Sequence, residues 1–588
     1  MCERMSLQIN SAAALMEKGD RARDAANVTS AVPSPDSLIG SLLNEQQDLT
    51  AVERFARLHS NGDVPAQAKR YSALLPMKQP GEGQQYAFEV DLDRCSGCKA
   101  CVTACHSLNG LDEGETWRDV GLLHGGSDEL PVLQHVTTAC HHCLQPACLA
   151  ACPVDAYEKD PVSGIVKHLD DQCFGCQYCT LACPYDVPKY NKRLGIVRKC
   201  DLCSGRLAVG EAPACVQACP SEAIAVRLVE TDQIEADCET NQFLPGAPEP
   251  QLTLPTTTYK TKRVFPRNML PADYYTVHPE HAHWPLVIML VLTQLSVGAF
   301  CVELVSKQFL ARELISALRP VHSLSALVFG LLALGASVFH LGRPQFAFRA
   351  VIGLKHSWLS REIVAFGIFA LLAVLYASAT WFDWGTSGFN QRCESFLGWG
   401  VGAAGLTGIG CSVMVYVFTR RMYWNGVRTT IRFVSTALLL GLAAAWLTLL
   451  LVSLGPGGEA AQMVVRQHGP VLCRSLMVVA IVKLLFEAAL FRHLRSRQNT
   501  PLRRSAVLLS GPLSSPALAR FSLGCLGGVC MPGFLLLDHS VEADAFDSQV
   551  FLTITVAMMF IACLVAEMLE RYLFFTSCVA PRMPGDLP

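Results

Sequence analysis

The hydrophobic pattern of the chain changes near Trp284. From there almost to the C-terminus, apolar residues form runs close to the ~20 residues that a helix needs to cross a bilayer. Eight such runs are present, at about 284–304, 321–341, 363–382, 396–419, 433–454, 471–491, 519–537 and 551–574. The seventh is the weakest, because Pro532 and several glycines interrupt it. Residues 281–588 are therefore predicted to form an all-α membrane domain of eight transmembrane helices.

The first half of the chain has a different pattern. Residues 1–85 form an extension in which apolar residues between Asp36 and Leu58 recur at helical spacing. This predicts amphipathic helices that pack on the next domain, or alternatively a docking arm for another subunit. Between residues 86 and 230, short strand-like pieces such as 86–90 and 224–228 flank groups of cysteines, which predicts an α+β domain. Prolines and a threonine run make residues 231–280 a predicted linker.

Cysteine spacing carries the clearest chemical signal. Four groups of four follow one another, and the last three groups each end in Cys-Pro. They are Cys95, Cys98, Cys101 and Cys105; Cys140, Cys143, Cys148 and Cys152; Cys173, Cys176, Cys179 and Cys183; and Cys200, Cys203, Cys215 and Cys219. A two-residue gap lets neighbouring thiolates wrap one face of an iron–sulfur cubane, and a cysteine before proline often ligates the partner cluster. Sixteen thiolates supply four 4Fe–4S clusters. Zinc sites and disulfides are the alternatives, but this cysteine spacing, repeated four times, is typical of neither.

Composition and charge restrict the class of protein. The chain has 588 residues and 26 cysteines, only 17% of its residues are charged, and its mean hydropathy is +0.30, so it is too apolar to be purely soluble. A net charge of −2 argues against nucleic acid as a partner. Basic residues concentrate before the first run and after the second, fourth and sixth. By the positive-inside rule this places both termini and the cysteine groups in the cytoplasm, and no export signal opposes that orientation.

Ionisable groups at membrane depth are the next candidates, because burying them in a bilayer is costly. His340 and Glu362 both fall at the predicted cytoplasmic edge, where a quinol would need proton acceptors near an electron acceptor. The alternative is a loop cap and a snorkelling surface residue. Lys483 and Glu487, one turn apart, could form a proton path, although a mutual structural pair is favoured. Glu567 could border the quinol pocket or anchor its helix. No pair of histidines on facing runs suits a haem, so none is expected.

The motifs resemble those of a known family. The run from Cys140 to Pro153 and the run from Cys173 to Tyr185 are similar to the iron–sulfur subunit of the dimethyl sulfoxide reductase family. His283-Trp-Pro285, His340-Leu-Gly-Arg-Pro344 and Trp358–Ile363 resemble the membrane anchor subunit of that family, although the polysulfide-reductase-type anchor shares a similar loop. The resemblance covers about four-fifths of the chain. The fusion of the two subunits and the N-terminal extension depart from the family pattern.

The resemblance has several implications. It implies a bis-ferredoxin-like fold, with clusters shared between the first and fourth cysteine groups and between the second and third. It places the family's menaquinol-site histidine and glutamate on His340 and Glu362. Arg343 and Glu567 are further candidate cofactor-binding residues of the pocket. It also implies a separate catalytic subunit that binds a molybdopterin cofactor.

The sequence therefore predicts an electron-transfer and anchor subunit that connects membrane quinol to such a partner. Two alternatives stay open: a stand-alone ferredoxin–quinone oxidoreductase, and a structural core subunit of a larger respiratory complex.

Overall fold

A computed structural model describes residues 71–308, 312–382, 387–455, 459–537 and 546–585. The chain divides into two compact units, Met1–Lys69 and Arg70–Pro588, and every described helix and strand lies in the second. The helices expected between Asp36 and Leu58 fall outside the described residues. The described chain begins with a short 3-10 helix, η1 (Ser72–Leu74).

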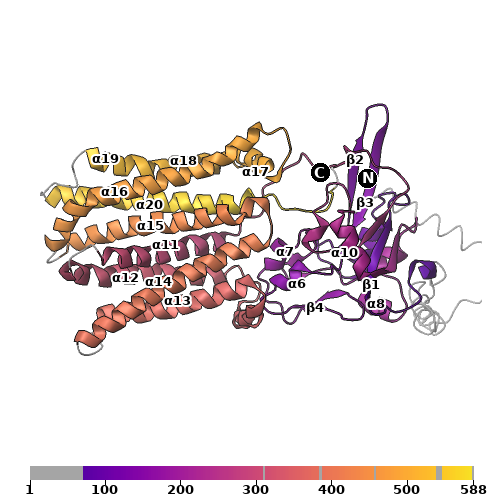
Figure 1. Cartoon of the computed structure of the whole chain (residues 1–588), viewed down its shortest axis with the longest axis horizontal. Coiled ribbons are helices and arrows are strands. Elements are labelled where there is room, and N and C mark those ends of the chain that lie inside the picture. The colour runs from indigo at the N-terminus through magenta and orange to yellow at the C-terminus, as the bar shows by residue number, and fades with distance from the viewer. Residues whose placement is uncertain (1–70, 309–311, 383–386, 456–458, 538–545, 586–588) are drawn as a thin grey trace, which may run out of the picture. The chain divides into compact units, whose positions relative to one another are not determined.

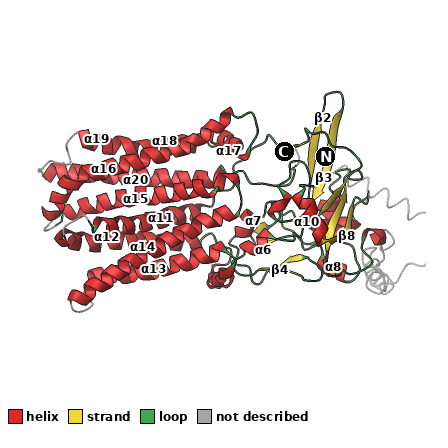
Figure 2. Cartoon of the chain, viewed as in Figure 1, coloured by secondary structure: helices red, strands yellow, loops and turns green. Residues whose placement is uncertain are grey.

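The first half of this unit, here called the cysteine domain (residues 71–280), contains all the described strands (Figure 2). β1 (Gln84–Asp91) pairs antiparallel with β8 (Ile224–Glu230), with Phe88 opposite Val226. These two strands contain the strand-like pieces that the sequence predicts, and their apolar residues form the buried face. A second sheet holds the hairpin of β2 (Asp119–Gly126) and β3 (Pro131–Thr138). Two further hairpins are β4 (Tyr157–Lys159) with β5 (Val166–His168), and β6 (Lys189–Asn191) with β7 (Ile196–Arg198).

Short helices connect these strands and contain or adjoin the cysteines. They are α5 (Ala100–Leu108), α6 (Ala147–Ala151), α7 (Tyr178–Ala182), α8 (Ser204–Ala208) and α9 (Ala214–Gln217). Most are about one turn long, so their positions depend on the surrounding packing rather than on helix propensity.

The segment that the sequence predicts as a linker is folded onto the cysteine domain. It forms α10 (Thr231–Glu239), η2 (Pro250–Leu252), β9 (Thr258–Lys260) and β10 (Leu270–Pro271). β9 adds to β1 in parallel, and β10 adds to β2. Unpaired backbone groups at a sheet edge favour such additions even where prolines break the local pattern.

Long helices make up the second half, here called the membrane domain (residues 281–585) (Figure 1). They are α11 (Trp284–Ser306), α12 (Arg312–Val338), α13 (Trp358–Trp381), α14 (Ser387–Phe418), α15 (Gly426–Ser453), α16 (Glu459–Ala488), α18 (Ser514–Cys525), α19 (Met531–Leu537) and α20 (Phe546–Thr576). A π-helical turn, Leu526–Cys530, joins α18 to α19. The shorter elements are η3 (Pro344–Lys355), η4 (Met422–Trp424), η5 (Ala489–Arg495) and α17 (Pro501–Ser510).

Seven helical stretches in the described residues are long and apolar enough to cross a membrane, rather than the eight that we predict from sequence. The interrupted seventh run is among them, as Ser514–Leu537. The sixth run is helical, in α16 and the start of η5, but is not one of the seven. It carries Arg474, Lys483 and Glu487 in an otherwise apolar stretch.

α11 is the most buried of these helices and packs against α12, α14, α15 and α20. Its approach to α15 depends on small residues, because a Cβ at Gly298 would lie 1.9 Å from the Ala437 carbonyl oxygen. The Gly400, Gly402 and Gly405 series lies inside α14, where the last of these packs on Val297 and Phe369. These glycines therefore serve helix packing.

Candidate cluster cages and membrane-edge site

The cysteines of the predicted ligand set lie in four spatial groups, here called cages I to IV. Three of them line separate small cavities: cage I is Cys95, Cys98, Cys101 and Cys219; cage II is Cys140, Cys143, Cys148 and Cys183; and cage III is Cys152, Cys173, Cys176 and Cys179. Cage IV is Cys105, Cys200, Cys203 and Cys215, in which Cys105 lies within electrostatic reach of Cys203 and Cys215. Each cage thus takes three cysteines from one sequence group and the fourth from another, as the resemblance implies.

Two of the cages are built by the same local backbone. Gly97 and Lys99 in cage I, and Gly175 and Gln177 in cage III, all have positive φ between 59° and 73°. They alternate with the cysteines, so the chain curls around a point instead of continuing as a strand or helix. The short helices α5 and α7 begin directly after Lys99 and Gln177. This local geometry points three thiols of each group to one side.

Buried cations lie among the thiols. Lys199 is 3% exposed, and its Nζ lies 3.6 Å from Cys140 Sγ and donates to the Cys200 carbonyl at 2.9 Å. Burial lowers the pKa of Lys199, but Cys140, Cys148 and Cys200 more than offset this, and the pKa lies above its usual value. Its charge faces cages II and IV.

A second buried cation faces cages I and IV. Arg118 is 2% exposed and donates to Thr137 Oγ1 at 3.1 Å. Its Nε and Nη2 have no hydrogen-bond partner in the described part of the chain, although Cys215, Cys101 and Cys200 lie in its field. Buried donors without protein partners fit thiolate or sulfide acceptors, and a 4Fe–4S cluster with four thiolates is an anion that such cations stabilise.

Cage III lies at the edge of the membrane domain. Arg343 N donates to the Phe174 carbonyl at 3.0 Å, and Gly342 N approaches the Gly175 carbonyl at 3.4 Å. Both acceptors lie between Cys173 and Cys176. A Cβ on Gly342 would lie 2.0 Å from the Gly195 carbonyl oxygen, so only glycine lets the loop after α12 come this close. The His340–Pro344 motif is thus a docking loop for cage III.

The segment that leads into α13 contacts the same cage. Ser357 Oγ donates to the Ala151 carbonyl at 2.7 Å, and Gly353 N donates to the Pro153 carbonyl at 2.9 Å. These carbonyls flank Cys152, the cage III cysteine that comes from the second sequence group. Glu362 lies in the second turn of α13, is 5% exposed, and accepts a hydrogen bond from Ser412 of α14.

His340 lies just beyond the end of α12. Its Nδ1–H donates to the Ser337 carbonyl, which leaves Nε2 as the lone-pair nitrogen of the neutral ring. Burial lowers the pKa of His340 to about 4, so the ring is neutral near pH 7. No hydrogen bond or ion pair joins His340 to Glu362 among the described residues. The structure brings both residues to the cage III edge without pairing them.

Arg343 and Glu567 have protein partners. The Arg343 guanidinium donates to the carbonyls of Leu194 at 3.2 Å and Asp170 at 3.0 Å, so it ties the two domains together. Glu567 is wholly buried deeper in the bundle. Its carboxylate accepts from Thr436 at 2.6 Å and from Arg520 at 3.1 Å, and it also pairs with Lys483.

Lys483 and Glu487 belong to the same buried ionic network. Their closest charged atoms are 3.9 Å apart, whereas Glu487 pairs with Arg520 at 3.0 Å and Lys483 pairs with Glu567. The expected mutual pair is thus a minor contact in a larger network. Arg520 is only 2% exposed and is absent from the sequence prediction, since it lies in the weakest apolar run.

Two further residues at the edge escape sequence reasoning. Tyr178, between Cys176 and Cys179, donates from its hydroxyl to the Val415 carbonyl of α14 at 2.9 Å and lies in the field of Glu362. His283 precedes α11 and lies close enough to His340 to contribute to the lowering of its pKa. The sequence offers two signals for these residues: Tyr178 lies inside a cysteine motif, and His283 lies beside Trp284. Neither signal predicts that the residue lies at the cage III edge.

Comparison with known proteins agrees with both halves of this arrangement. Residues 132–228 match the 4Fe-4S dicluster domain, and residues 277–576 match the DMSO reductase anchor subunit. An anaerobic dimethyl sulfoxide reductase subunit of Haemophilus influenzae is 32% identical over 189 residues, which cover 31% of this chain and 91% of that protein.

Two other relatives are similar over about a quarter of the chain. The corresponding anaerobic dimethyl sulfoxide reductase subunit of Escherichia coli K12 is 37% identical over 148 residues, covering 24% of this chain and 72% of that protein. The thiosulfate reductase electron transfer subunit PhsB of Salmonella typhi is 37% identical over 154 residues, covering 26% of this chain and 80% of that protein. The chain therefore belongs to the dimethyl sulfoxide reductase family, as an electron-transfer iron–sulfur subunit and its membrane anchor joined in one polypeptide.

Proposed function

We propose that the chain passes electrons between membrane quinol and a separate molybdopterin-containing catalytic subunit, through four 4Fe–4S clusters held in cages I to IV. The observation that carries the proposal is the contact of the docking loop, and of Gly353 and Ser357 just before α13, with the backbone of cage III. This contact brings one cage to the membrane edge at which His340 and Glu362 lie.

The cages follow one another in a definite order. Cages III and II exchange cysteines of the second and third sequence groups, and Tyr157 lies in the field of Cys179, Cys148 and Cys152. Lys199 bridges cages II and IV, and Arg118 bridges cages IV and I. Cys98 of cage I is exposed. The relay accordingly runs III, II, IV, I, with its outer end at the surface where a partner subunit would bind.

At the membrane edge the protein residues would handle protons. A quinol loses two electrons and two protons when it becomes a quinone, and clusters accept electrons one at a time. His340 Nε2 offers a lone pair toward one quinol hydroxyl, and the Glu362 carboxylate offers an acceptor for the other. Ser412 orients Glu362, and the Ser337 carbonyl sets the tautomer of His340.

Arg343 and Glu567 take supporting roles in this proposal. Arg343 holds the docking loop on the cysteine domain through two backbone carbonyls. Glu567 stabilises the helix bundle through Lys483 and Arg520.

The same proposal includes an eighth membrane crossing in α16. Its buried charges face protein partners rather than lipid: Lys483 is 1% exposed and Glu487 is 8% exposed. Paired charges inside a bundle are compatible with a crossing segment. With eight crossings and basic loops on the side of the cysteine domain, that domain and both termini would lie in the cytoplasm, at the inner membrane.

Two variants test the quinol site. Glu362→Gln and His340→Gln each remove one proton acceptor, so quinol-driven reduction of the clusters should fall about 100-fold or more, in line with the usual value of general base catalysis. Iron content and reduction by dithionite should match the parent protein. Glu158→Gln, at an exposed glutamate of the cysteine domain, is the control.

Unchanged quinol-driven rates in both variants would refute the assignment of the site. Metal analysis of the complex purified with its partners tests the rest of the proposal. It should find about sixteen iron atoms per chain, four for each cluster. It should also find molybdenum in a second polypeptide.

A further inference from the structure

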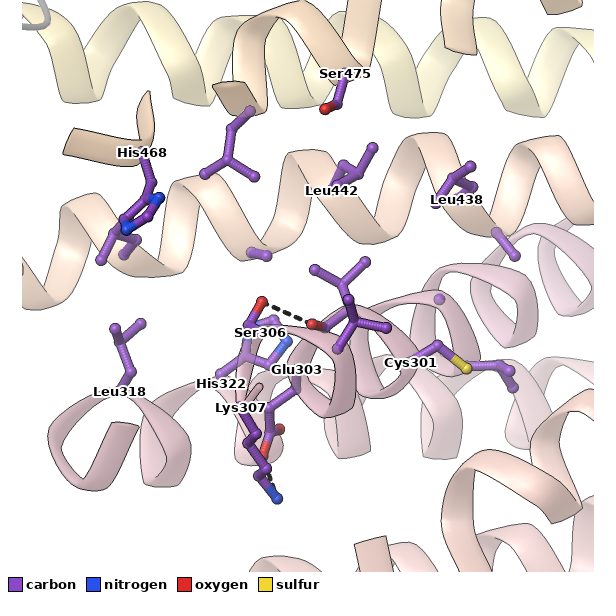
Figure 3. Close-up of a pocket in the computed structure, with 18 of the residues that line it drawn as sticks. Cys301, Glu303, Ser306, Lys307, Leu318, His322, Leu438, Leu442, His468 and Ser475 are labelled. Atoms are coloured by element: carbon purple, nitrogen blue, oxygen red, sulfur yellow. Dashed lines mark hydrogen bonds and ion pairs between the residues drawn. The ribbon is translucent and has the colours of Figure 1, made fainter. Parts of the chain in front are cut away.

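A cavity in the described part of the membrane domain (Figure 3) has no residue of the docking loop in its wall. It has a volume of about 700 Å³ and lies between α11, α12, α15 and α16, with Leu406 of α14 also in its wall. Cavities that hold drug-sized ligands measure roughly 300–1,000 Å³. None of the residues proposed to handle protons at the cage III edge lines it.

Most of the wall is aliphatic. Along α15 the lining runs from Val434 to Leu449, which at the rise of an α-helix spans roughly 22 Å. α12 packs on α11 and α16 packs on α15, and α12 and α16 scarcely touch one another. Leu438 and Val471 in the wall are 43% and 54% exposed. The cavity is thus long, apolar and open between α12 and α16, as a chain-like ligand from the lipid phase requires.

One end of the cavity is polar. Glu303, Ser306, Lys307, Arg319, His322 and His468 line it there. Figure 3 shows Glu303, Ser306, Lys307 and His322 grouped together, with His468 of α16 across from them. The cations at this end are already neutralised. Lys307 lies 3.5 Å from Glu303, and Arg319 pairs with Glu394. A ligand with an anionic head would gain little here, so the polar end favours a neutral head.

Hydrogen-bonding groups remain for such a head. His322 is engaged with the Ala299 carbonyl at 3.0 Å and with Thr448 Oγ1 at 3.3 Å. His468 on α16 is different, because its ring has no hydrogen-bond partner in the described residues. An imidazole N–H donates well to a carbonyl oxygen.

We infer that this cavity is a second, distal binding site for a neutral isoprenoid quinone, with the ring at the His468 end and the tail along α15. The site is separate from the one in the proposed function and does not depend on it. It has no cage beside it, so the ligand would be resident rather than turned over.

The test measures phylloquinone, a naphthoquinone with an isoprenoid chain, retained by the purified full-length complex after incubation and gel filtration. All variants are made in the Glu362→Gln protein, in which the site at the cage III edge is impaired. Activity at that edge site is measured in a separate assay, as quinol-driven reduction of the clusters. Ala445→Phe on α15 and Ser475→Phe on α16 fill the cavity from opposite walls, and Leu451→Phe, at a 52% exposed position of α15 outside the wall, is the matched control.

The expected result is that Glu362→Gln and its Leu451→Phe derivative retain phylloquinone equally, while both cavity-filling derivatives retain at least fivefold less. Equal retention in a folded cavity-filling derivative would overturn the inference. Displacement of phylloquinone by an equimolar amount of dioleoylphosphatidylglycerol would also overturn it, because that outcome assigns the cavity to phospholipid. If Glu362→Gln loses quinol oxidation but still retains phylloquinone, the result supports both the edge site of the proposed function and a separate distal site.

Discussion

Replacing Gly342 by alanine should uncouple the membrane domain from the cysteine domain. The added Cβ would lie 2.0 Å from the Gly195 carbonyl oxygen and 2.5 Å from its carbonyl carbon. Heavy atoms pack at roughly 3.5 Å, so the two backbones would have to separate by about 1.5 Å. The obstacle is backbone on both sides, which no side-chain rotation relieves.

The separation has a cost that the local contacts set. It would weaken the hydrogen bonds from Arg343 N to Phe174 and from Gly342 N to Gly175, each worth about 1 kcal/mol. With an overpacking cost of about 1–3 kcal/mol, the domain contact should lose roughly 2–4 kcal/mol. A misplacement of about 1 Å can slow a positioned reaction about 100-fold, so quinol-driven cluster reduction should fall between about tenfold and 100-fold.

The assay compares cluster reduction by quinol and by dithionite in the same preparation. Gly342→Ala should be slow with quinol and normal with dithionite, with unchanged iron and sulfide. Gly335→Ala in α12 is the matched control, because nothing lies within 4 Å of its added Cβ. If Gly342→Ala matched Gly335→Ala in quinol-driven rate and in thermal stability, the docking argument would be wrong.

Three buried ionisable residues give further predictions. Lys199→Met removes a cation next to Cys140, and this cation favours the more negative reduced state of the cluster. With the charge about 6 Å from the cluster and an effective dielectric of about 20, the reduction potential of that cluster should fall by the order of 100 mV. Redox titration followed by electron paramagnetic resonance should detect this fall, and should show no such change in the exposed Lys192→Met. Lys483→Met leaves Glu567 with one cation fewer in a buried network and should lower the free energy of unfolding by about 3 kcal/mol, measured by thermal unfolding. The control Arg94→Ala breaks an exposed ion pair and should lower it by less than about 1 kcal/mol. Burial lowers the pKa of His340 to about 4, so the unfolded chain binds the extra proton first as the pH falls, and stability should decline from about pH 6.5 to about pH 4; His340→Gln should flatten that decline by up to about 3 kcal/mol, and an unchanged slope would show that the ring is not buried.

The sequence alone determined the chemistry and the division of this protein into halves. Sixteen cysteines at fixed spacing indicate iron–sulfur clusters, because local chain geometry is enough to place three thiols around one point. Apolar runs of membrane length locate the helices for the same reason, since a helix satisfies its own backbone wherever it lies. His340 and Glu362 could be singled out because each is an ionisable group at a predicted membrane edge.

Only the tertiary structure decided which elements meet. That cage III is the one at the membrane edge depends on a close approach of Gly342 to Gly195, two residues almost 150 positions apart with no pattern that links them. The partners of Lys483 and Glu487 came from α18 and α20, because burial makes each charge pair with whichever opposite charge the bundle brings near. The segment predicted as a linker adds a strand to each of the two three-stranded sheets, since the edge strand of a sheet has unpaired backbone groups. Spacing along a chain determines local ligand geometry, whereas contacts between distant segments depend on shape complementarity that only the folded molecule contains.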